Sequence, residues 1–191
     1  GLDGTGRLYR SLAAELATDF DVRVFDYPDD VLGSYPELAA SIIARLPQEK
    51  PFVLVAESFA GPLSVLVASK RPAGLRGLVI AASFLRSPVT KSKALAQLLQ
   101  RFPDNLMPPL AVLEILLMGR WRNLQVRQAL HSSLQDVPPR VLKSRLLCAM
   151  RVDVRGQFDR IGVPVLYLRA SRDRLLRKGV ALDFAMVARP P

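Results

Sequence analysis

The chain has 191 residues but only one cysteine, Cys148, and one histidine, His131. A single cysteine excludes an internal disulfide, and one residue of each kind is too few for a structural zinc site. Aromatic residues make up only 7% of the chain and show no basic-aromatic pattern, which argues against nucleic-acid binding. No apolar run approaches the ~20 residues of a membrane span, and no secretory leader is recognisable. We therefore expect a cytoplasmic protein without a metal centre or a membrane span.

What the sequence does contain is an apolar run that leads into a serine held between small residues. Phe52 to Gly61 reads Phe-Val-Leu-Val-Ala-Glu-Ser-Phe-Ala-Gly, which predicts a strand, a sharp turn and a helix, with Ser58 at the tip. A nucleophile in such a turn has a strained backbone and needs small neighbours two residues away on either side. Ala56 and Ala60 meet that need, although the motif usually has glycines there. The alternative is an ordinary serine that caps a helix.

A helical pattern follows Ser58. Residues 59–71 carry apolar side chains at helical spacing and close with Lys70 and Arg71, a cationic last turn. Ser58 is therefore expected at a helix N-terminus, where free backbone N–H groups and the helix dipole stabilise negative charge. The N–H of Phe59 would point to the oxyanion of a tetrahedral intermediate formed at Ser58.

The chain opens with the glycine-rich turn Gly-Leu-Asp-Gly-Thr-Gly, ahead of an amphipathic helix over Leu8 to Leu16. Such a turn could hold a phosphate, but its spacing fits neither GxGxxG nor GxxxxGK[ST]. From this turn onward the expected order is helix, strand (Val22 to Phe25), helix, strand, serine turn, helix and strand. This order resembles the α/β-hydrolase family. The resemblance implies that the N–H of Leu2 is the second oxyanion donor.

Strands and helices alternate up to a strand over Leu75 to Ala82, which predicts a mostly parallel sheet flanked by helices. From residue 85 to about 157 the sequence is helical, with expected helices over 91–102, 110–121, 124–134 and 138–150. Strand character returns at Val163 to Leu168. An inserted all-helical segment resembles the lid of an α/β-hydrolase. We expect a first core part over 1–84, a helical lid over 85–157 and a second core part over 158–191.

The loop after Val163 to Leu168 contains Asp173. In the α/β-hydrolase family the triad acid stands in this loop. The resemblance therefore assigns to Asp173 the role of orienting the catalytic histidine and offsetting its positive charge. The alternative is a solvated carboxylate that pairs with Arg172 or Arg174.

The general base is the difficulty, because His131 lies inside the expected lid. In the family the histidine follows the acid, after the last strand. The chain ends 18 residues beyond Asp173 without such a strand, and it begins at the glycine-rich turn without the strands that usually precede it. We expect a fragment of a longer protein whose C-terminal segment carries the base. His131 is then a surface or packing residue.

The net charge of +10 is concentrated on the expected lid. Residues 85–157 contain twelve lysine and arginine residues against four acids. Such a field would attract an anionic acyl donor, such as a coenzyme A ester or an acyl carrier protein, or an anionic membrane surface. The simpler interpretation is that these side chains form the solvated faces of the lid helices.

Together these patterns predict an α/β-hydrolase fold and a serine hydrolase that cleaves a carboxylic ester or thioester through an acyl-enzyme intermediate. Ser58 would attack the carbonyl carbon, the N–H groups of Phe59 and Leu2 would hold the oxyanion, and Asp173 would orient a histidine outside this chain. No cofactor or metal is implied. The alternative is a non-catalytic module that keeps the fold and binds a ligand or a scaffolding partner.

Overall fold

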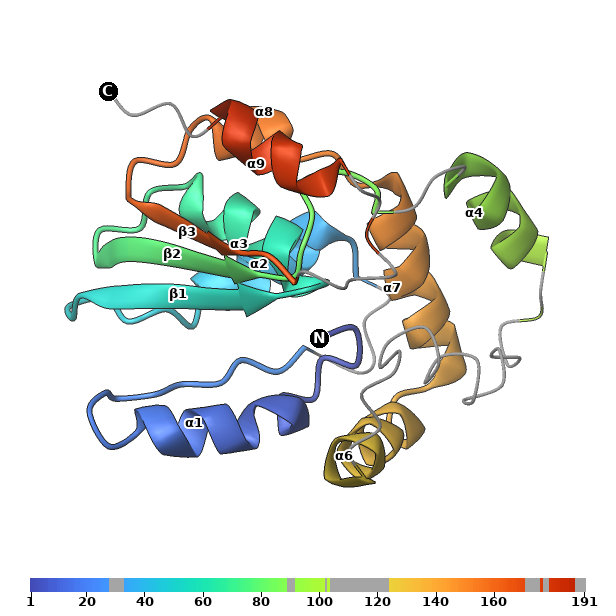
Figure 1. Cartoon of the computed structure of the whole chain (residues 1–191), viewed down its shortest axis with the longest axis horizontal. Coiled ribbons are helices and arrows are strands. Elements are labelled where there is room, and N and C mark those ends of the chain that lie inside the picture. The colour runs from blue at the N-terminus through green and yellow to red at the C-terminus, as the bar shows by residue number, and fades with distance from the viewer. Residues whose placement is uncertain are drawn as a thin grey trace.

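A three-stranded parallel sheet forms the centre of the molecule (Figure 1). The structure is a computed structural model that describes residues 1–27, 33–88, 92–101, 103, 124–170, 176 and 179–187. The strands stand in the order β1-β2-β3 and comprise Phe52–Glu57, Leu75–Ala81 and Val165–Leu168. Each corresponds to a strand expected from the sequence, and both pairings are parallel.

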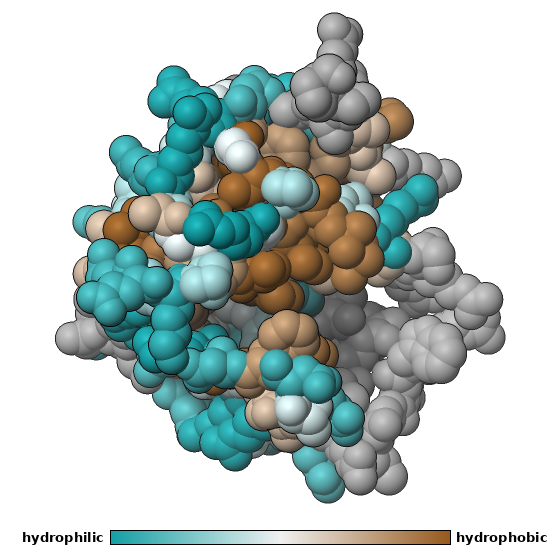
Figure 2. Space-filling model, turned by 90° about the vertical axis from the view of Figure 1, so that its left-hand side faces the viewer, coloured by the Kyte–Doolittle hydropathy of each residue, from teal (hydrophilic) through white to brown (hydrophobic). Residues whose placement is uncertain are grey.

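The two faces of this sheet have different surroundings, since successive strand residues point to opposite sides. Leu78 and Ile80 lie on the covered face, and each is at most 1% exposed. The opposite face carries large apolar side chains that are between 48% and 56% exposed, namely Val53, Val55, Leu166 and Leu168. Figure 2 shows hydrophobic side chains gathered on one side of the molecule between hydrophilic regions. The core therefore lies on one side of the sheet.

Helices build the covered side. α2 (Tyr35–Ile43) begins with a capping box between Ser34 and Glu37, and α3 (Ala60–Ala68) is buried along most of its length. α8 (Arg155–Phe158) contacts α3 and α9 (Val180–Val187). Phe184 of α9 stacks on Tyr167 of β3, with ring centroids 3.9 Å apart. The result is a helical layer packed on one face of a parallel sheet, one of the layer contacts that build an α/β fold.

Between β2 and β3 the described residues form helices joined by short non-helical connections, and the sequence predicted helices here. We call residues 85–157 the insertion. It contains α4 (Ser92–Arg101), α6 (Leu124–Gln135) and α7 (Pro139–Arg151), which lie beyond the carboxyl ends of the strands (Figure 1). The helix expected over 110–121 lies outside the described residues. The insertion thus lies at the edge of the sheet where Ser58 follows β1.

The expected strand over Val22 to Phe25 is wrong. The amino-terminal part forms a short 3₁₀ helix η1 (Arg7–Tyr9) and α1 (Arg10–Leu16), but residues 21–27 form no strand. The β-branched residues of this segment favour an extended backbone, but a strand also needs a hydrogen-bonded neighbour. The segment forms no strand because it has no such neighbour among the described residues. Within the described ranges, β1 pairs only with β2.

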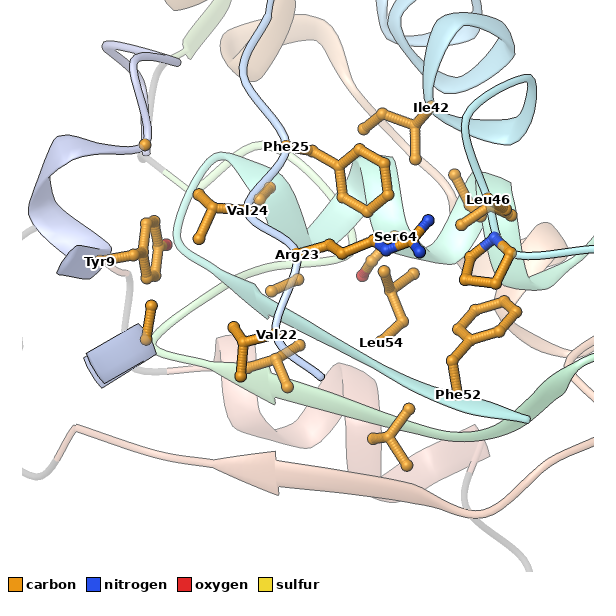
Figure 3. Close-up of a pocket in the computed structure, with 18 of the residues that line it drawn as sticks. Tyr9, Val22, Arg23, Val24, Phe25, Ile42, Leu46, Phe52, Leu54 and Ser64 are labelled. Atoms are coloured by element: carbon orange, nitrogen blue, oxygen red, sulfur yellow. The ribbon is translucent and has the colours of Figure 1, made fainter. Parts of the chain in front are cut away.

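A groove of about 660 Å³ separates this segment from the free edge of β1 (Figure 3). Apolar side chains line most of it, among them Val24, Phe25, Leu46, Phe52 and Leu54. Ser58 is not one of its lining residues. Across the described ranges of the chain, no helix is both long and apolar enough to cross a membrane.

Candidate active site

Ser58 occupies a sharp turn between the end of β1 at Glu57 and the start of α3 at Ala60. Its φ angle is 51°, in the left-handed region that non-glycine residues rarely adopt. Such a conformation costs free energy and persists only where the surroundings enforce it. The residue is half-buried, and its hydroxyl makes no hydrogen bond to another part of the described chain. The strained turn predicted from the sequence is therefore present.

Hydrogen bonds from β2 and the residues that follow it fix the Ser58 backbone. The N–H of Ser58 donates to the carbonyl of Ala81 at 3.0 Å, and the hydroxyl of Ser83 donates to the carbonyl of Ser58 at 2.5 Å. Gly61 N–H donates to the same carbonyl at 3.0 Å. The Tyr167 hydroxyl in turn donates to the carbonyl of Ser83 at 3.0 Å. All three strands thus contribute to holding the turn.

Gly61 lets α3 pass directly against Ser83, and we expect Gly61→Ala to destabilise the fold. An added Cβ at this position would lie 2.6 Å from the Cβ of Ser83, too close for the backbone to stay in place. Overpacking of this kind costs about 1–3 kcal/mol. Chemical denaturation should show a lower free energy of unfolding for Gly61→Ala. Gly156→Ala is the matched control, because nothing lies within 4 Å of its added Cβ. Equal unfolding free energies for the two variants would contradict the close approach.

Phe59, the residue after Ser58, is held between two tyrosine rings. Its ring stacks on that of Tyr35 at 4.7 Å and tilts against that of Tyr27 at 6.1 Å, measured between centroids. Burial raises the pKa of Tyr35 far above its ordinary value, so its hydroxyl keeps the proton that it donates to the carbonyl of Phe59 at 3.1 Å. The N–H of Phe59 donates to no other described residue. Within the described chain this amide is thus held in place and has no acceptor, as the oxyanion prediction requires.

The glycine-rich turn is compact and well anchored. Gly4 has φ 67° and donates its N–H to the carbonyl of Gly1 at 3.3 Å. The carboxylate of Asp3 accepts hydrogen bonds from the backbone and hydroxyl of Thr5, at 3.0 and 2.6 Å. Leu2 packs against the hydrophobic cluster that contains Phe59, and its N–H donates to no other described residue. Among the described residues, the N–H groups of both predicted oxyanion donors therefore have no acceptor, and both donors lie next to one hydrophobic cluster.

A second contact joins the amino-terminal segment to the serine turn. The hydroxyl of Tyr9 donates to the carboxylate of Glu57 at 3.0 Å. Burial raises the pKa of Tyr9, and the negative charge of Glu57 raises it further. Tyr9 therefore stays protonated and keeps donating. Glu57, the residue before Ser58, serves to tie η1 to the end of β1.

The remaining predicted residues are not brought to Ser58 by any described contact. His131 is half-buried on α6, a helix that packs against η1. Asp173 lies outside the described residues. In the portion of the chain that the structure covers, no group of three histidine, cysteine or acidic side chains could hold a metal ion.

The structure changes the interpretation of the charge on the insertion. Arg145 is 2% exposed and Lys143 is 6% exposed, so neither adds to a solvated basic face. Arg86 pairs with the fully buried carboxylate of Asp183 at 2.9 Å, and Arg155 pairs with Asp153 at 2.7 Å. Part of the charge is therefore buried or ion-paired and does not form a free basic surface.

Sequence reasoning missed two groups of residues that shape this site. The hydroxyls of Ser83 and Tyr35 donate hydrogen bonds to backbone carbonyls of the serine turn. No sequence pattern around either residue indicates this role. Arg145 bonds the carbonyls of Leu2 and Asp3, at 3.1 and 2.5 Å. One signal was available for Arg145, because it falls four residues after Val141 and four before Ala149, within the buried stripe of α7.

Comparisons with known proteins identify the family of this chain. A family model described as "Serine aminopeptidase, S33" matches residues 21–189 of the chain. The chain belongs to this family of α/β-hydrolases. It is accordingly a hydrolase of the α/β type, and the matched region includes the sheet, Ser58 and the insertion. No curated protein sequence matches the chain.

Solved structures of the same fold are distant in sequence. A hydrolase from Oleispira antarctica superposes with a TM-score of 0.79 and 16% identity, over 97% of this chain and 76% of that chain. A thermophilic esterase from Thermogutta terrifontis superposes with a TM-score of 0.76 and 18% identity, over 95% of this chain and 73% of that chain. A lipase-esterase related protein from Clostridium acetobutylicum superposes with a TM-score of 0.76 and 15% identity, over 95% of this chain and 76% of that chain. At these identities the likeness establishes the fold, an α/β-hydrolase fold with a parallel sheet flanked by helices.

Proposed function

We propose that this α/β-hydrolase is a serine hydrolase that cleaves a carboxylic ester or thioester through an acyl-enzyme intermediate. The observation that carries the proposal is the left-handed backbone of Ser58 at the junction of a parallel strand and a helix. A turn of this kind places a hydroxyl at the carboxyl edge of the sheet, and its backbone strain costs free energy that the surrounding contacts must offset. Some of the structural neighbours are esterases, which supports the same substrate class.

In the proposed mechanism, the Ser58 hydroxyl attacks the substrate carbonyl while a histidine takes its proton. The N–H groups of Phe59 and Leu2 bind the resulting oxyanion, and α3 adds the positive end of its dipole. The intermediate collapses, the alcohol or thiol takes the proton from the histidine and leaves, and the acyl group remains on Ser58. Water then repeats the same steps and releases the acid. Asp173 orients the histidine, which is proposed to lie outside these 191 residues. The protein is proposed to be cytoplasmic.

An acyl-enzyme intermediate makes a prediction about product ratios in the protein expressed from its complete reading frame. Hydroxylamine and water should compete for one acyl-enzyme, so the ratio of hydroxamate to acid should not depend on the leaving group. We would compare p-nitrophenyl, phenyl and thiophenyl esters of one acyl chain. A ratio that changes with the leaving group would mean direct attack by water and would contradict the proposal. A full-length protein that turns over none of these substrates would favour the non-catalytic alternative.

The substrate is further proposed to be an anionic acyl donor attracted by the insertion. If so, kcat/KM for an acyl-coenzyme A should fall as salt rises, because the Debye length shrinks from ~10 Å at 0.1 M to ~3 Å at 1 M. Arg101 and Arg151 are exposed at the ends of α4 and α7. Reversing both to glutamate should flatten the salt dependence for the anionic substrate alone. An equal salt response for a neutral p-nitrophenyl ester of the same chain length would contradict steering.

A further inference from the structure

Arg145 places a guanidinium in the middle of an apolar helix face. Val141, Arg145 and Ala149 follow one another at intervals of four residues on α7, and all three are buried. Removing a guanidinium from water is costly unless its N–H groups find partners. Two of its hydrogen bonds reach the glycine-rich turn at the start of the chain, at the carbonyls of Leu2 and Asp3.

Those contacts form a relay of peptide groups. Arg145 Nη1 donates to the carbonyl of Asp3, and the peptide group that carries this carbonyl also carries the N–H of Gly4. That N–H donates to the carbonyl of Gly1, whose peptide group carries the N–H of Leu2. Because a trans peptide is planar, its C=O and N–H point in opposite directions. Holding the Asp3 carbonyl therefore fixes the direction of the Leu2 N–H two peptide groups away.

We infer that Arg145 is a positioning residue that aims the Leu2 N–H at the oxyanion, and that it makes the oxyanion hole depend on the docking of the insertion. This inference rests on the serine hydrolase function proposed above. The positive charge also polarises the relay, since a charged donor on the Asp3 carbonyl strengthens the hydrogen bond that the Gly4 N–H donates.

The surroundings of the turn leave Arg145 little freedom. The guanidinium carbon lies 5.4 Å from the centre of the Tyr27 ring, and Tyr27 N–H donates to the carbonyl of Gly4 at 2.8 Å. A Cβ on Gly4 would lie 2.8 Å from Arg145 Nη1, so only glycine leaves space for it. Arg7 ties the same segment to the insertion a second time, through the carbonyl of Ser132 and the carboxylate of Asp136.

The test compares Arg145→Met, Arg145→Lys and the control Arg140→Met in the full-length protein with a neutral p-nitrophenyl ester. Arg140 is exposed on the same helix. A misdirected oxyanion donor should lower kcat by roughly 10- to 100-fold with KM nearly unchanged, since complete loss of a donor costs about 10²- to 10³-fold. Arg145→Lys should recover part of the loss, because lysine keeps the charge but not the forked geometry. Arg140→Met should behave as wild type.

Two further readouts separate positioning from folding. A trifluoromethyl ketone with the same acyl chain forms an oxyanion on the serine, so its Ki should rise by the same factor as kcat/KM falls. Amide hydrogen exchange at Gly4 should accelerate in Arg145→Met and stay unchanged in Arg140→Met. If Arg145→Met does not fold, the same comparisons are made with Arg145→Lys.

The outcomes distinguish this inference from the proposed function. Wild-type kcat in Arg145→Met and Arg145→Lys, or a loss confined to KM, would overturn the positioning role while the serine hydrolase function stands. A wild-type protein that hydrolyses no ester would mean that the proposed function has failed. In that case, Gly4 amide exchange still tests whether Arg145 orders the glycine-rich turn. Unchanged exchange in Arg145→Met would contradict that ordering, and faster exchange would support it.

Discussion

Replacing Ser58 with alanine in the full-length protein is expected to lower kcat for a p-nitrophenyl ester by about 10⁴- to 10⁶-fold. Without the hydroxyl no acyl-enzyme forms, and only the oxyanion donors and substrate binding remain, which give a small residual rate. The fold should survive, because the Ser58 hydroxyl bonds no other described residue. Steady-state kinetics and a thermal melt of the same preparation measure both effects.

Ser69→Ala provides the matched control for this substitution. Ser69 lies at the other end of α3, where its hydroxyl donates to the carbonyl of Leu66 at 2.9 Å. Its removal should leave kcat within about twofold of wild type, since surface and cap substitutions of this size act mainly on stability. Turnover in Ser58→Ala that matches turnover in Ser69→Ala would remove Ser58 from the mechanism.

The second large effect concerns the general base. The 191-residue chain expressed alone is expected to hydrolyse esters about 10⁴- to 10⁶-fold more slowly than the full-length protein, because its only histidine, His131, is not the proposed base. In the full-length protein, His131→Ala should keep kcat within a few-fold of wild type. The short chain, the full-length protein and its His131→Ala variant are compared in one esterase assay at equal concentrations of folded protein.

Two results would contradict this assignment. Esterase turnover by the short chain at the full-length rate would show that a group within these residues supplies the base. A loss of about 10⁴-fold in full-length His131→Ala would identify that group as His131 and would require α6 to approach Ser58 during catalysis.

Local patterns predicted the parts of the fold that depend on neighbours in sequence. The apolar run before Ser58 and the small residues Ala56 and Ala60 were enough to locate a strand, a turn and a helix, and the structure forms all three. Helical periodicity between β2 and β3 likewise predicted both ends of α4, α6 and α7 to within one residue. These elements are set by short-range sterics and periodicity, which a sequence displays directly.

Features that depend on distant partners could not be predicted. Val22 to Phe25 has the composition of a strand but no paired neighbour among the described residues, and pairing cannot be inferred from the segment itself. Arg145 counted as one more charge of a basic face, because composition does not distinguish a buried guanidinium from a solvated one. The hydrogen bond from Ser83 to Ser58 spans 25 residues and depends on the register of β1 and β2.

The most direct test of the central claim is reaction of the full-length protein with a fluorophosphonate, followed by mass spectrometry of the modified peptide. The account predicts one adduct per chain, located on Ser58, and no adduct in Ser58→Ala under the same conditions. It also predicts that labelling and loss of esterase activity proceed at the same rate. An adduct on another residue, or labelling that persists in Ser58→Ala, would contradict the assignment of Ser58 as the nucleophile.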